Sequence, residues 1–166
     1  MIKYVTVIGS SGKIDEKTYS IAEKLGEILA QNKYIIVTGG RSGVMEAVCK
    51  GAKKAGGLTI GILPGFTRED ANPYVDIIIP TGLGYARNAI NVLAGDVVVA
   101  ISGGPGTLSE IGLALAYNKP LIVLKGCGGV SELISKEGIK GYNIEIANTP
   151  EEVLEKIRKM ENKVTC

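Results

Sequence analysis

A glycine-rich turn at residues 102–107 is the segment of this sequence best suited to hold a ligand. It has the sequence SGGPGT, it follows a run of apolar residues, and a second apolar segment comes after it. Glycines let the backbone wrap an anion without Cβ clashes. If a helix begins here, its unpaired N–H groups and its dipole favour a phosphate. A plain tight turn has equal weight, but the pattern predicts phosphate binding by Gly103, Gly104, Gly106 and Thr107.

Two further turns carry similar signals. One contains Gly9 and Ser10, and the other contains Gly39, Gly40 and Arg41. Both follow short apolar runs, and in an open parallel sheet such turns meet at the carboxyl edge, where ligands bind. We therefore predict that these five residues belong to the same phosphate or nucleotide site. A surface salt bridge is an equally good role for Arg41.

Two charged residues stand in otherwise apolar segments. Arg87 lies in the segment 84–94, and a buried charge there requires a partner, such as a ligand oxyanion. Glu110 follows Thr107 by three residues, a spacing that fits a capping box in which the Glu110 carboxylate bonds back to the Thr107 amide. The pattern alone favours this cap. The alternative places the carboxylate beside a bound phosphate, facing a sugar.

The composition excludes several classes of chemistry. The chain has no histidine and only three widely spaced cysteines, so we expect no metal site and no other resident cofactor. A net charge of +2 does not indicate the strongly basic surface that nucleic-acid-binding proteins carry. No lysine follows the 102–107 turn, and no dinucleotide fingerprint is present, which disfavours kinase and hydride-transfer functions. No signal peptide and no apolar run of about 20 residues occurs, so we expect a cytoplasmic protein without membrane contact.

Short apolar runs alternate with helical periodicity and supply the elements that position these turns. Strands are expected at 4–8, 34–38, 58–63, 75–79, 97–101, 121–124 and 142–146. Helices are expected at 16–31, 43–55, 84–94 and 107–118, with a last helix that begins at Pro150, is N-capped by Thr149 and has Glu152 closing a capping box.

This alternation predicts the α/β fold class: a Rossmann-like, doubly wound, mainly parallel sheet of about seven strands with helices on both faces. A single nucleotide-binding domain is expected over 1–162, with a flexible tail at 163–166. The segments 84–94 and 107–118 are apolar over most of their surface. That composition predicts a homodimer or a higher homo-oligomer.

Two segments, 39–45 (GGRSGVM) and 103–110 (GGPGTLSE), resemble the signature segments of the LONELY GUY (LOG)-like proteins. That family, long labelled lysine decarboxylases, also includes the molybdenum-cofactor carrier proteins, and the resemblance covers most of residues 1–125. It implies a Rossmann-like fold, dimers or larger oligomers, and nucleotide 5′-monophosphate binding with the 5′-phosphate on the glycine turn. In the phosphoribohydrolase members an arginine and the motif glutamate serve N-glycosidic cleavage. On this chain they would be Arg87 and Glu110.

The sequence departs from the enzyme pattern at two places. The enzymes usually have Pro-Gly-Gly where this chain has Ser102-Gly103-Gly104, and a lysine where it has Asn88. The stretch 80–88 resembles the carrier-like branch more closely. Two functions therefore stay open: hydrolysis of a nucleoside 5′-monophosphate to free base and ribose 5-phosphate, or non-catalytic carriage of molybdenum cofactor or a related pterin phosphate. No pyridoxal-phosphate lysine motif supports amino-acid decarboxylation.

Overall fold

The computed structural model describes residues 2–164 and contains a twisted sheet whose neighbouring strands are all parallel. The strand order is β4-β3-β2-β1-β5-β6-β7. The bounds are β1 (Tyr4–Gly9), β2 (Ile35–Thr38), β3 (Thr59–Leu63), β4 (Ile77–Pro80), β5 (Val97–Ile101), β6 (Leu121–Leu124) and β7 (Glu145–Ala147). The predicted α/β, Rossmann-like fold is confirmed.

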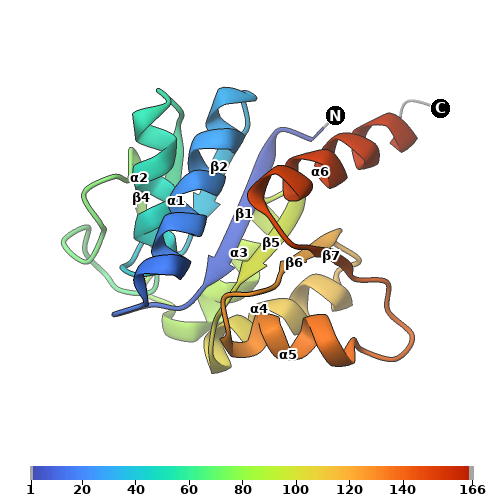
Figure 1. Cartoon of the computed structure of the whole chain (residues 1–166). Coiled ribbons are helices and arrows are strands. Elements are labelled where there is room, and N and C mark those ends of the chain that lie inside the picture. The colour runs from blue at the N-terminus through green and yellow to red at the C-terminus, as the bar shows by residue number, and fades with distance from the viewer. Residues whose placement is uncertain (1, 165–166) are drawn as a thin grey trace.

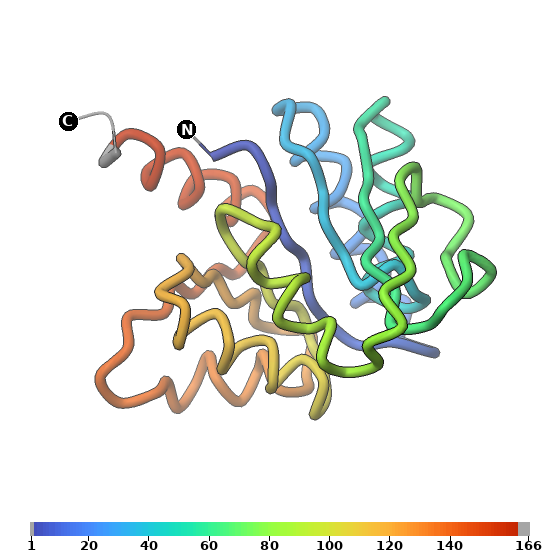
Figure 2. Tube along the Cα trace, turned by 180° about the vertical axis from the view of Figure 1, so that it is seen from behind, coloured from blue at the N-terminus to red at the C-terminus, as the bar shows by residue number. Residues whose placement is uncertain are grey.

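Helices cover both faces of this sheet (Figures 1 and 2). The helices α1, α2 and α6 pack on one face, and α3, α4 and α5 pack on the other. Their bounds are α1 (Glu16–Gln31), α2 (Val44–Lys54), α3 (Arg87–Ala94), α4 (Pro105–Ala116), α5 (Gly129–Glu137) and α6 (Pro150–Val164), with a 3₁₀ turn η1 (Gly84–Ala86) just before α3. No helix in the described part of the chain has both the length and the apolarity to cross a bilayer.

The core explains why the central strands lack polar alternation. Every residue of β5 is buried, and its side chains divide between the two faces. Val97 and Val99 contribute to the core under α1, α2 and α6, whereas Val98 and Ala100 contribute to the core under α3, α4 and α5. A strand buried on both faces has no solvent side on which polar residues would be favoured.

Several boundaries differ from expectation, and three of them have a clear local cause. β4 starts at Ile77, because the Val75 amide closes a turn onto the Asn72 carbonyl and Asp76 lies in a bend. β7 starts at Glu145, since the Tyr142 amide closes a turn onto Ile139 instead of pairing with β6. Helix α6 continues to Val164, so residues 163 and 164 of the expected tail are helical. Residues 165 and 166 lie outside the described range.

Only one of the two hydrogen bonds of the predicted capping box forms at the start of α6. The Glu152 amide donates to the Thr149 hydroxyl at 3.2 Å, which confirms Thr149 as a side-chain cap. The Glu152 carboxylate instead accepts from the amide of Asn148, one residue earlier, at 2.7 Å.

The sheet reverses its winding at β1, which pairs with β2 on one side and β5 on the other. The turns that follow β1, β2 and β5 therefore lie next to one another at the carboxyl edge. Such a topological switch point leaves a crevice between diverging loops.

Candidate functional site

An open cleft of about 910 Å³ lies at this switch point. All of the residues predicted for the site line it except Gly40. Gly40 has φ +74°, and a Cβ on it would lie 2.9 Å from the Leu63 side chain. Gly40 therefore packs beneath the loop that forms this wall of the cleft, and it does not face the cleft itself.

The 102–107 turn has the form of an anion cradle. Helix α4 begins at Pro105 with Gly104 as N-cap, so the first-turn amides lack intrahelical partners. A Cβ on Gly104 or Gly106 would meet no protein atom within 4 Å, because both face open space. Gly103 differs: its φ is +103°, and a Cβ would lie 2.4 Å from Thr107. Gly103 thus allows the tight turn, and the other two leave room for a ligand.

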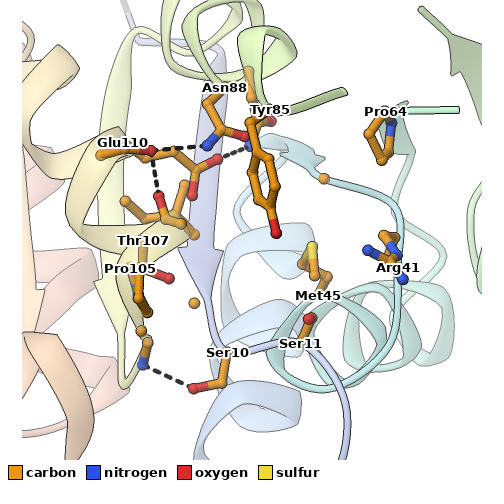
Figure 3. A pocket seen from close by; sticks show the side chains of 18 of the residues that line it. Ser10, Ser11, Arg41, Met45, Pro64, Tyr85, Asn88, Pro105, Thr107 and Glu110 are labelled. Carbon is orange, nitrogen blue, oxygen red and sulfur yellow. Dashed lines mark hydrogen bonds between the residues drawn. The ribbon is translucent and has the colours of Figure 1, made fainter. Parts of the chain in front are cut away.

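Two flanking elements hold this turn in place. From the β1 side, the Ser10 hydroxyl accepts from the Gly103 amide at 2.8 Å, as Figure 3 shows, and lies 3.0 Å from the Ser102 hydroxyl. From the other side, the first turn of α5 approaches. The amides of Val130 and Ser131 donate to the carbonyls of Gly103 and Ser102 at 2.8 and 3.0 Å. The cradle is therefore fixed before any ligand arrives.

Glu110 lies in the second turn of α4 and does not cap the helix. Its Oε1 accepts from Asn91 Nδ2 at 2.8 Å and lies 3.7 Å from Arg87 Nη1. All three side chains are buried. The predicted capping box is wrong because Pro105 starts the helix early and places Thr107 inside its first turn. The other carboxylate oxygen, Oε2, has no hydrogen-bond partner among the described residues and remains for a ligand or water.

Burial sets the electrostatics of this pair. It raises the pKa of Glu110, against the Asn91 hydrogen bond and the charge of Arg87, which both lower it. Burial also lowers the pKa of Arg87; Glu110 opposes that shift and the charge of Arg41 adds to it. Arg41 and Arg87 are thus two like charges at one cleft, and only one carboxylate neutralises them in part. An anion bound there would relieve this repulsion.

Gly39 makes room for the Arg87 guanidinium. A Cβ at residue 39 would lie 2.5 Å from Nη1 and 2.7 Å from Nη2 of Arg87. The turn after β2 therefore supports a side chain that comes from α3. This contact explains in steric terms why a glycine stands at position 39.

Comparison with known proteins places the chain in a family. The sequence model of the SLOG cluster4 family matches residues 2–154. The chain belongs to that family. A solved molybdenum cofactor binding protein from Rippkaea orientalis is 41% identical to it, with a TM-score of 0.88 over 96% of this chain and 98% of the other. The molybdenum cofactor carrier protein of Chlamydomonas reinhardtii is 35% identical, with a TM-score of 0.85 over 98% and 99% of the two chains.

An enzyme relative is more distant in sequence. A cytokinin riboside 5′-monophosphate phosphoribohydrolase of Rhodococcoides fascians is 31% identical over 133 residues, which is 74% of this chain and 67% of that protein. The predicted resemblance to LOG-like and molybdenum-cofactor carrier-like proteins is thereby confirmed for this SLOG cluster4 protein. Both branches of the resemblance are present among its relatives.

Several cleft residues of the SLOG cluster4 protein were not predicted. Asn88 donates to the Ser109 hydroxyl at 2.9 Å, and that hydroxyl donates to the Gly106 carbonyl at 2.7 Å. This chain of bonds ties α3 to the first turn of α4. Asn91 holds Glu110, as described above. A signal was present: both asparagines share an apolar helix with Arg87, and polar residues in such a helix indicate a buried network.

Asn72 supports the Arg41 wall from below. It is buried. Its side-chain Nδ2 donates to the Arg41 carbonyl at 2.9 Å, and its backbone N–H donates to the Gly40 carbonyl at 2.8 Å. Arg41 itself points its side chain toward the cleft, on the wall opposite Thr107 and Glu110 (Figure 3). The long 64–74 loop thus fixes the backbone from which Arg41 projects.

Proposed function

We propose that this cleft binds an organic phosphate of nucleotide type, with the phosphate on the 103–107 turn. The observation that carries the proposal is the cradle itself. Gly104 and Gly106 leave open space at the N-terminus of α4, where amides and the helix dipole favour an anion. The names of the relatives support a ring-bearing phosphate, because one acts on a riboside 5′-monophosphate and two bind a molybdenum cofactor.

The first candidate activity is hydrolysis of a nucleoside 5′-monophosphate. Water would add to C1′ of the ribose as the bond from C1′ to the base nitrogen breaks. The bonding electron pair would leave with the base, which takes up the proton that the attacking water releases, and the products would be free base and ribose 5-phosphate. Glu110 Oε2 would stabilise the positive charge that develops on the sugar and orient the water. Arg87 and Asn91 would hold the carboxylate in position through Oε1.

The second candidate is non-catalytic carriage of a pterin phosphate such as molybdenum cofactor. A specific observation favours it: Ser102 has φ +56°, a conformation that proline cannot adopt. The enzymes' Pro-Gly-Gly therefore could not occupy this turn with the backbone it has here. The carrier and binding proteins also match this chain over nearly its whole length, at 35% and 41% identity.

One experiment separates the two candidates. The purified protein is incubated with a panel of nucleoside 5′-monophosphates, and free base is measured by chromatography. Ligand-dependent melting is measured in parallel with AMP, GMP, ribose 5-phosphate and a pterin phosphate. Base release supports the hydrolase, whereas binding of a pterin phosphate without any base release supports the carrier. If no phosphate ligand moves the melting temperature, the assignment of the cradle is wrong.

We also propose that the protein is a symmetric homodimer or a larger homo-oligomer through the outer faces of α3 and α4. The two helices pack side by side, and their only charged residues, Arg87 and Glu110, are buried. Ile90, Leu93 and Leu108 are exposed on them. An apolar surface on two adjacent helices is typical of a subunit interface.

Light scattering at several protein concentrations tests this oligomer. Leu93→Lys should shift the protein toward the monomer, because a charge would be buried at the interface. Leu133→Lys on α5 is the matched control, since Leu133 is equally a large exposed apolar residue on a different helix. A wild-type protein that stays monomeric at every concentration would contradict the proposal.

A further inference from the structure

Tyr85 is the one aromatic side chain among the described residues that line the cleft. The residue is 86% exposed. Figure 3 shows the ring extending from the edge of the cleft between the wall of Thr107 and Glu110 and the wall of Arg41 and Met45. In the described part of the chain, its hydroxyl has no hydrogen-bond partner. A large aromatic residue thus lines the cleft with most of its surface open to solvent.

The backbone that carries this ring is held firmly. Tyr85 lies in η1, whose Gly84 amide donates to the Pro64 carbonyl at 3.0 Å. Just before it, the Gly82 amide donates to the Gly65 carbonyl at 2.8 Å, and the Thr81 hydroxyl donates to the Leu63 carbonyl at 2.7 Å. The ring is therefore presented from a fixed position, and its exposure does not come from a loose loop.

The neighbouring Phe66 is a second exposed aromatic residue, and its position differs from that of Tyr85. Phe66 is also highly exposed, at 88%, but it does not line the cleft. Its ring instead packs over Gly82, where a Cβ would lie 2.7 Å from Phe66 Cε1. Two exposed aromatic rings thus flank the same turn, and only Tyr85 shares the space in which a ligand on the 103–107 turn must extend.

We propose that Tyr85 stacks on a planar heteroaromatic ring of the ligand whose phosphate occupies the 103–107 turn. The inference rests on the proposed function, and it specifies the ligand class: a phosphate that bears a flat base or pterin, recognised in preference to a simple sugar phosphate. Aromatic stacking tolerates any flat ring, because every such ring has a π-face. In this proposal the Tyr85 side chain recognises the ring of the ligand, whereas backbone amides recognise its phosphate.

The test compares ring-bearing and ring-free ligands on the full chain. The probes are neopterin monophosphate, ribose 5-phosphate and the carbocyclic analogue of AMP, which resists glycosidic cleavage. Dissociation constants are measured by calorimetry for wild type, Tyr85→Ala, Tyr85→Phe and the control Phe66→Ala. We expect Tyr85→Ala to weaken the ring-bearing probes about ten-fold or more, while ribose 5-phosphate binding stays within about two-fold. Tyr85→Phe and Phe66→Ala should bind like wild type.

Three results would overturn the stacking role. One is an equal loss of ribose 5-phosphate and ring-bearing probes in Tyr85→Ala, which indicates a general structural effect. Another is an unchanged affinity for the ring-bearing probes in that variant. A third is a loss in Tyr85→Phe as large as in Tyr85→Ala, which assigns recognition to the hydroxyl. Failure of wild type to bind any probe is a different outcome, because it removes the proposed phosphate site and the stacking role together.

Discussion

Asn91 Nδ2 and Arg87 Nη1 approach the same oxygen, Oε1 of Glu110, at 2.8 and 3.7 Å. The neutral amide makes the hydrogen bond, and the guanidinium is the more distant of the two partners. The backbone of Asn91 is itself fixed, because its main-chain carbonyl accepts from the Thr6 hydroxyl of β1 at 2.8 Å. The carboxylate orientation therefore depends on a residue that carries no charge.

Glu110→Gln tests whether this carboxylate takes part in catalysis. The glutamine carbonyl can still accept from Asn91, and burial already disfavours the charged carboxylate. The variant leaves the buried Arg87 guanidinium without the carboxylate that partly neutralises it, so we expect the free energy of unfolding to fall. Breaking a buried pair from one side typically costs about 3–5 kcal/mol, and the 3.7 Å separation together with the lost desolvation cost of the carboxylate places this variant at the lower end of that range. If the protein hydrolyses a nucleotide, turnover should fall by about 100-fold or more. Steady-state assays and melting curves measure both; a variant with full turnover would remove Glu110 from the mechanism.

The raised pKa of Glu110 predicts a pH-dependent difference between wild type and this variant. The folded protein binds the Glu110 proton more tightly than the unfolded chain, whose pKa is near 4.5. The contribution of this group to stability is thus fully present below about pH 4.5 and is lost as pH rises through the raised pKa. Wild-type stability should therefore decline relative to Glu110→Gln across that window. Denaturant unfolding of both proteins at several pH values checks it, and a constant difference would contradict the burial effect.

Gly106→Val tests the cradle without disturbing the core. Its Cβ has no neighbour within 4 Å, so the protein should fold, but the branched side chain would fill the space meant for the anion. We expect the stabilisation by phosphate ligands, about 2.7 kcal/mol at 100 times the dissociation constant, to disappear. Gly112→Val is the matched control: it lies in the same helix, its Cβ is equally unobstructed, and it is outside the cleft. If Gly106→Val retained the ligand-induced shift in melting temperature, the phosphate would not lie on this turn.

Ser102 tests whether the backbone distinguishes this turn from the one in the enzymes. Ser102→Pro cannot reach φ +56°, so it should lower the free energy of unfolding by more than about 1 kcal/mol and abolish phosphate binding. Ser102→Gly is the companion variant, because glycine accepts this φ and removes only the hydroxyl near Ser10. It should fold at least as well as wild type. A proline variant with normal melting and normal binding would show that the turn is more adaptable than its geometry indicates.

The glycine turns could be predicted from the sequence because their cause is local. A strand, a glycine run and an apolar helix are all visible within a short segment, and the switch point of a parallel sheet brings such segments together. Arg87 was predicted for the same reason, as a charge in an apolar helix. The roles of these residues in binding or catalysis stay predictions.

The supporting contacts could not be predicted because they join distant parts of the chain. Nothing near Asn91 indicates that it faces Glu110, and nothing near Asn72 indicates that it holds the Arg41 loop. Helix α5 was not expected at all: it has nine residues, begins in glycines with positive φ, and contains only three large apolar residues, Val130, Leu133 and Ile134. The capping box failed for a local reason, since Thr107 and Glu110 had the right spacing but Pro105 began the helix first.

The bonds from Val130 and Ser131 to the carbonyls of Gly103 and Ser102 have a consequence for how much of the chain the site requires. The family's signature segments both end before α5 begins, so a chain truncated ahead of Gly129 would keep every recognisable motif. It would nevertheless lose the contacts that brace one side of the cradle. The ligand site therefore needs more of the chain than its motifs: α5, which follows β6, must pack beside the turns that come after β1 and β5.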